Sequence, residues 1–161
     1  MLCKITDRFG VCANGRTWGS GIRHTGMSIP VNRSPLLAAL LGTHLSKPLL
    51  WAVDETATMG KGLQVRCINV QTMHLITMPE VSVEDRIRFA ILCALEIGVN
   101  DPRAYRFALR DLRGARGVIE SKPLATSATR VSGHLLQAAS RAAEDILGEV
   151  DWEGLAQEAV G

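Results

Sequence analysis

Hydrophobic and polar positions follow different patterns in the two halves of the chain. Up to about residue 80, apolar residues form short runs, some alternating with polar residues, between turns that are rich in glycine. From residue 82 onwards, apolar residues recur every three or four positions, which is typical of amphipathic helices. The pattern predicts an α+β protein in which helices from the C-terminal half pack on an antiparallel sheet from the N-terminal half.

The strands are expected in five short segments, at 2–5, 11–13, 49–54, 63–70 and 73–78. Residues 7–10 predict a turn after the first strand, with Gly10 at its last position, so that 11–13 would return as the partner strand. Leu63, Val65 and Cys67 alternate with other residues and would share one face of the sheet. Because the later connections are short, we expect an antiparallel meander.

A short helix at 34–42 interrupts the strands, and both of its ends are marked. Ser34 can cap the first N–H groups, Pro35 suits the first helical position, and Gly42 can end the helix. The helix is apolar on all sides, so we expect Leu37, Leu40 and Leu41 to be buried.

The second half predicts four helices. The first follows Ser82, which forms a capping box with Asp85, and ends at Gly98. A second is expected at 101–113, a third at about 127–147, and a short last helix after Asp151. We therefore expect one domain made of a β-rich part, 1–80, and a helical part, 81–161.

Composition excludes several classes of protein. Apolar residues make up 47% and charged residues 21% of the 161 residues, which excludes a disordered chain. No apolar run reaches the about 18 residues of a membrane span, and the first residues show no signal peptide, so we expect a cytoplasmic protein. The four cysteines lack C-x-x-C spacing and predict reduced thiols, with no metal site and no cofactor.

Basic residues are concentrated in the first half. Residues 1–80 carry 8 basic and 4 acidic side chains, whereas 81–161 carry 10 basic and 12 acidic ones. Four arginines, spaced three or four positions apart, would share one face of the 101–113 helix: Arg103, Arg106, Arg110 and Arg113. They can contact a phosphate backbone or form a solvated face paired with the acidic C-terminus. We expect the second arrangement, and no nucleic-acid affinity at physiological salt.

The glycine-rich segment 14–26 is the main candidate site. Backbone N–H groups in such a loop can hold an anion, and arginine and tryptophan can add a charge clamp and a stacking face. The alternative is a set of hairpin turns around a core tryptophan, since the spacing matches no phosphate-binding fingerprint. The candidate ligand-binding residues are Arg16, Trp18, Arg23, His24 and Arg66, and no catalytic residue stands out.

The run Thr17-Trp18-Gly19-Ser20-Gly21, followed by His24, resembles the start of a family of small uncharacterised proteins from bacteriophages and bacterial genomes. The resemblance covers roughly residues 3–97 and is densest at 78–81, Met-Pro-Glu-Val, and at 86–96, Arg-Ile-Arg-Phe-Ala-Ile-Leu-Cys-Ala-Leu-Glu. The family pattern carries a Gly-Trp-x-His segment before the short helix, and this sequence lacks it at 27–33. The resemblance implies a phage-associated protein in the host cytoplasm.

The order of strands and short helix is also similar to that of ADP-ribosyltransferase-like folds, although the catalytic signature of that fold is not recognisable. This similarity implies a scaffold that binds a nucleotide-derived ligand without turning it over. We therefore expect a non-enzymatic binding protein that sequesters a small anionic signal and counters bacterial defence. The alternatives are an inhibitor that binds a bacterial host protein through the helical half, and a small ADP-ribosyltransferase-like enzyme. Association of the chain into a homo-oligomer is also compatible with the sequence.

Overall fold

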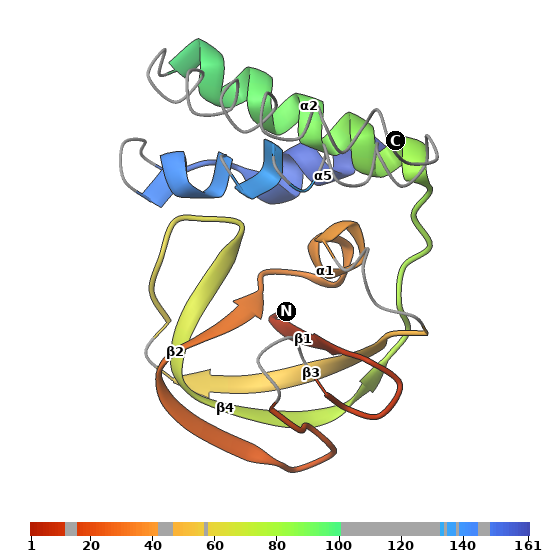
Figure 1. Ribbon diagram of the computed structural model, residues 1–161, viewed down its shortest axis with the longest axis vertical. Helices are drawn as coiled ribbons and strands as arrows, with labels where there is room; N and C mark the ends of the chain where they lie inside the picture. The colour runs from red at the N-terminus through yellow and green to blue at the C-terminus, as the bar shows by residue number, and fades with distance from the viewer. Residues whose placement is uncertain are drawn as a thin grey trace, which may run out of the picture. The chain divides into compact units, whose positions relative to one another are not determined.

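Four strands of the N-terminal half close into a small antiparallel barrel (Figure 1). The computed structural model describes residues 1–11, 16–41, 47–56, 58–100, 133, 135–137, 139–144 and 149–161. The chain divides into two compact units, one of Met1–Gly60 with Gln64–Glu80, the other of Lys61–Leu63 with Val81–Gly161. Strands lie in the first unit and the long helices in the second, so the α+β class is confirmed.

The barrel has the strand order β1-β2-β4-β3. Its strands are β1 (Cys3–Thr6), β2 (Arg23–Asn32), β3 (Leu49–Thr56) and β4 (Gln64–Ile76). Cys3 is opposite Asn32 of β2 and also opposite Ala52 of β3, which closes the sheet on itself. Strand β1 therefore pairs with β2 and β3. Val11 of the predicted partner strand makes an isolated bridge with Thr17 instead, and residues 12 and 13 lie outside the described residues.

Strand β2 was not expected, and β4 replaces two expected strands. The β2–β4 ladder shifts register between Thr25 and Ile29, and Pro30 lacks a backbone N–H, so the segment has no clear alternation. In β4 the buried positions are Val65, Cys67, Val70 and Thr72. The two members of each pair are two positions apart, but Cys67 and Val70 are three positions apart. The alternation is therefore interrupted, and the single strand of 13 residues was predicted as two.

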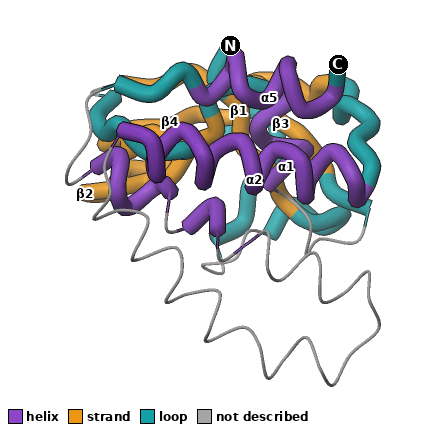
Figure 2. Tube along the Cα trace, turned by 90° about the horizontal axis from the view of Figure 1, so that it is seen from above, coloured by secondary structure: helices purple, strands orange, loops and turns teal. Residues whose placement is uncertain are grey.

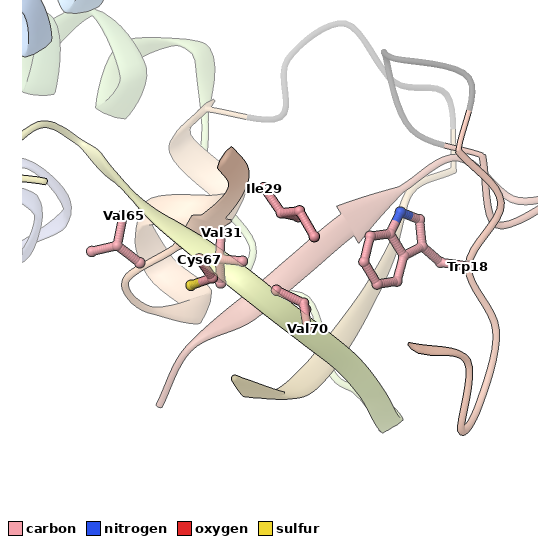
Figure 3. Close-up of a cluster of buried hydrophobic side chains, with 6 residues drawn as sticks. All are labelled: Trp18, Ile29, Val31, Val65, Cys67 and Val70. Carbon is pink, nitrogen blue, oxygen red and sulfur yellow. The ribbon is translucent and has the colours of Figure 1, made fainter. Parts of the chain in front are cut away.

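Hydrophobic side chains fill the barrel in one cluster (Figure 3). It consists of Trp18, Ile29, Val31, Val65, Cys67 and Val70, all at most 3% exposed. A second cluster joins Cys3, Ala38 and Leu50. Ala38 lies in helix α1 (Pro35–Leu41), so this helix covers part of the barrel near β1.

The predicted start of α1 is confirmed. Ser34 Oγ accepts a hydrogen bond from the Leu37 N–H at 3.2 Å, as an N-cap does. Leu37 and Leu40 are fully buried, whereas Leu41 is only half-buried, which corrects the prediction for that residue. Gly42 lies outside the described residues.

Helices α2 (Val83–Asn100) and α5 (Trp152–Val160) pack against each other in the second unit (Figure 2). The predicted capping box of α2 is present, because Ser82 Oγ accepts from Asp85 N and Asp85 Oδ2 accepts from Ser82 N. The helix continues two residues past Gly98, its predicted end. Asp151 caps α5 by accepting the Gly154 N–H at 2.9 Å.

The remaining helical predictions are tested only in part. Described residues between 133 and 144 are helical, in agreement with the predicted 127–147 helix. The predicted helix at 101–113, with its arginine face, lies outside the described residues. No helix in the described part of the chain is long and apolar enough to cross a membrane.

The tip of the β3–β4 connection, Lys61–Leu63, belongs to the second unit. The Lys61 and Gly62 N–H groups both donate to Glu144 Oε1, at 3.0 and 2.7 Å. The Leu63 N–H donates to Ser140 Oγ at 3.0 Å, and Trp152 Nε1 donates to the Lys61 carbonyl at 2.8 Å. We call this set of four hydrogen bonds the tip clasp.

Candidate ligand-binding site

Hydrogen bonds fix the glycine-rich segment to β4. The Gly21 N–H donates to the Thr72 carbonyl at 2.7 Å, and the Thr72 N–H donates to the Ile22 carbonyl at 3.0 Å. Ser20 Oγ donates to the Met73 carbonyl at 2.9 Å. Residues 19–22 are therefore held in one conformation beside the strand and lead directly into β2.

Three backbone N–H groups of the described part of this segment have partners within the protein. The Trp18 N–H donates to the Gly10 carbonyl at 2.6 Å, and the Ile22 N–H donates to the Gly19 carbonyl at 3.1 Å. With the Gly21 N–H also used, these three groups are not available to an anion, and residues 14 and 15 of the predicted loop lie outside the described residues. An anion bound here would be recognised by side chains.

Trp18 is a core residue. Its side chain is 2% exposed and lies against Ile29 and Val70 in the barrel cluster (Figure 3). Such burial does not fit the predicted role of an open stacking face, and it agrees with the alternative of a core tryptophan. The indole therefore supports the candidate site by packing.

His24 lies next to Trp18 at the start of β2. The two ring centroids are 4.4 Å apart with planes inclined at 66°, an edge-to-face contact. His24 Nε2 is 2.9 Å from the Thr17 carbonyl oxygen, which accepts a hydrogen bond from the ring. The imidazole is half-buried, so the hydrogen bond and the indole fix its orientation.

The three candidate arginines have different surroundings. Arg23 is exposed, and its Nη2 donates to Oε1 of Gln71, the residue opposite it on β4. Arg16 is half-buried, and its guanidinium lies over Gly26, where an added Cβ would be 3.0 Å from Nη2. Arg66 is exposed on β4 opposite Pro30. Arg16 and Arg23 thus have different neighbours, Gly26 for the first and Gln71 for the second.

A buried lysine in the barrel was missed. Lys4 is 6% exposed, its Nζ donates to the Pro30 carbonyl at 2.7 Å, and it lies 5.6 Å from the centroid of the Trp18 ring. A carbonyl and an aromatic face both stabilise an ammonium group away from water. The sequence around Lys4 does not reveal its burial, because a charged residue in a strand with alternating apolar and polar positions is normally predicted to face solvent.

The barrel also encloses a thiol. Burial raises the pKa of Cys67, with a smaller effect from the negative charge of Glu55, while Thr58 and Lys4 act in the opposite direction. Cys3, Cys67 and Cys93 are buried and reduced, as predicted for these three. Among the residues that the structure describes, no group of three or more His, Cys, Asp or Glu could hold a metal ion.

Comparison of the chain with protein-family models, with curated proteins and with solved structures finds no match.

Proposed function

We propose that this protein is a non-enzymatic binding protein and that the segment 16–26 recognises a small anionic ligand. The anchoring of this segment to β4 carries the proposal. A segment that is already ordered presents the exposed Arg23 to a ligand without a further loss of conformational entropy. His24, the next residue of β2, points to the opposite face, where it contacts Trp18. Arg16 adds a second guanidinium to the same short segment.

The ligand class that we favour is nucleotide-derived. The support for this step is the resemblance to bacteriophage proteins, together with the basic character of the first 80 residues, which carry 8 basic and 4 acidic side chains. A phage product that sequesters such a signal in the host cytoplasm would counter a bacterial defence. This role rests on analogy with the family and not on a catalytic arrangement of residues.

Arg23→Ala tests the binding site. A charge-assisted hydrogen bond contributes about 1.5–3 kcal/mol, so the variant should bind an anionic nucleotide about ten- to a hundredfold more weakly. Because Arg23 is exposed, the melting temperature of the protein without ligand should hardly change. Thermal shift and calorimetric titration with adenosine 5′-monophosphate and ribose 5-phosphate measure both effects.

The matched control is Arg141→Ala, which removes an exposed arginine from the second unit. Equal loss of affinity in both variants would show a general effect of net charge and would refute a site at 16–26. Unfolding of Arg23→Ala would show that the residue is structural.

One observation favours the alternative of a protein–protein inhibitor. On α2, Ile91 and Leu95 are 47% and 58% exposed and lie one turn apart, on the side away from the buried Phe89 and Cys93. Exposed apolar pairs of this kind occur in protein interfaces. Capture of one host protein by the wild type but not by Leu95→Asp would favour this function.

A further inference from the structure

We propose that Phe9 is the stacking platform for the ring of the ligand, and that the ligand is a planar aromatic group carrying negative charge. The inference rests on the proposed function and names the part of the ligand that the arginines do not recognise. It also replaces Trp18, which is buried, as the aromatic element of the site.

The turn that carries Phe9 is rigid. Asp7 Oδ1 accepts hydrogen bonds from the Phe9 and Val11 N–H groups, at 2.8 and 2.9 Å. The Asp7 carbonyl accepts the Gly10 N–H at 3.0 Å, and the Asp7 N–H donates to the Val11 carbonyl at 2.8 Å. One aspartate therefore fixes the turn through both its side chain and its backbone.

Gly10 fixes the turn to the candidate segment. Its φ of +79° is in the region that favours glycine, and an added Cβ would lie against the Trp18 carbonyl oxygen. The Trp18 N–H also donates to the Gly10 carbonyl. The turn is thus joined to the residue that contacts His24, at the start of the proposed site.

Phe9 is exposed although its backbone is fixed. Its side chain is 71% exposed, the largest value among the exposed large apolar side chains of the described residues. The Arg8 guanidinium carbon lies 4.7 Å from the centroid of the Phe9 ring, so a cation lies over the ring. An exposed ring on a hydrogen-bonded turn can stack on a planar ligand without a further loss of backbone entropy.

The charges around the ring favour an anionic partner. The Asp7 carboxylate accepts two N–H groups of its own turn, whereas Arg8 is exposed beside the ring. The first unit as a whole carries 7 basic and 4 acidic residues. A ring with a phosphate group satisfies both features, and a mononucleotide combines them.

The test compares Phe9→Leu, which keeps an apolar side chain, with Phe9→Tyr, which keeps the ring. Calorimetric titration at low salt uses adenosine 5′-monophosphate, ribose 5-phosphate and adenosine as probes. We expect Phe9→Leu to weaken binding of the nucleotide about tenfold and to leave binding of ribose 5-phosphate unchanged, while Phe9→Tyr retains wild-type affinity for both. Neither variant should change the melting temperature, because the side chain is exposed.

The possible failures are distinguishable. If the nucleotide binds, Arg23→Ala weakens it and Phe9→Leu does not, the platform is wrong and the proposed function stands. If the wild type binds none of the three probes, both proposals fail for nucleotides. A further titration with a single strand of ten thymidines tests whether the ring that stacks on Phe9 belongs to a nucleic acid. If Phe9→Leu weakens binding of the strand about tenfold and leaves binding of the mononucleotide unchanged, the platform binds single-stranded nucleic acid, and the mononucleotide is overturned as the ligand.

Discussion

Burial of the thiols changes their chemistry more than any neighbouring charge does. Cys93 is 0% exposed on α2, and burial is the main reason that the pKa of its thiol is raised far above the ordinary value. Cys67 is 1% exposed in the barrel, and its pKa is raised for the same reason. Since the thiolate is the reactive form, both residues should be inert in the folded protein.

We expect Cys67 and Cys93 to resist alkylation by iodoacetamide at pH 8 and to react fully in urea. Peptide mass spectrometry of the two samples measures the modification at each residue. Rapid modification of Cys93 without urea would show that α2 opens easily, in conflict with its burial.

The pKa of Asp85 is lowered, in contrast to the raised pKa values of the two thiols. Hydrogen bonds from the backbone N–H and the hydroxyl of Ser82 lower its pKa below the usual value of 3.8. A lowered pKa in the folded protein means that the carboxylate stabilises the fold above the pKa of the unfolded chain, and that this stabilisation is lost as the pH falls through the folded pKa.

Ser82→Ala should therefore raise the pKa of Asp85 toward its ordinary value. It should also make the stability of the protein less dependent on pH in the acidic range. An NMR titration of the Asp85 carboxyl gives the pKa, and urea unfolding at acidic and neutral pH gives the stability. An unchanged pKa in the variant would show that the Ser82 hydroxyl does not act on Asp85, because the backbone N–H of residue 82 is still present.

At the scale of elements, helix starts were predictable and strands were less so. Ser34, Ser82 and Asp151 each accept from the N–H group three residues further along, so a short stretch of sequence contains the whole interaction. Strand β2 depends on a partner about 40 residues further along the chain, and its register shift hides the alternation. The site shows the same limit, because only tertiary packing decides that Trp18 is buried and Phe9 exposed.

Helix α1 offers a direct test of the packing on the barrel. Leu40 is 0% exposed, so Leu40→Ala should destabilise the protein by about 2–5 kcal/mol through the cavity that it leaves. The control is Leu95→Ala, because Leu95 is 58% exposed on α2 and its truncation should cost no more than about 0.5 kcal/mol. Urea unfolding measures both values, and similar losses in the two variants would contradict the placement of α1.

At the scale of the molecule, the tip clasp joins three segments that are distant in sequence. Its partners, Ser140, Glu144 and Trp152, lie 77 to 91 residues beyond the hairpin tip. Gly62 is enclosed by Ser140 and Glu144: an added Cβ would lie against Ser140 Oγ and 3.0 Å from Glu144 Oε1. Any side chain at this position would displace the groups that hold the tip.

Gly62→Ala should therefore destabilise the protein, by an amount comparable to the loss of a buried hydrogen bond, about 1–3 kcal/mol. Gly133→Ala is the matched control, since the same change there meets no atom within 4 Å and removes freedom from the unfolded chain. The control should be neutral or stabilising. Chemical denaturation of both variants measures the free energy of unfolding. An unchanged value for Gly62→Ala would show that the tip clasp rearranges without cost.

The clasp also sets an order of events while the ribosome makes the protein. All four strands of the barrel have been synthesised by residue 76, whereas the residues that hold the hairpin tip follow 77 to 91 residues after it. At a translation rate of about 5–20 residues per second, these residues are synthesised roughly 4–18 s after the tip. During that interval its three consecutive N–H groups lack Ser140 and Glu144 as acceptors, so the nascent chain is the form of this protein in which another carboxylate can most readily take the place of Glu144.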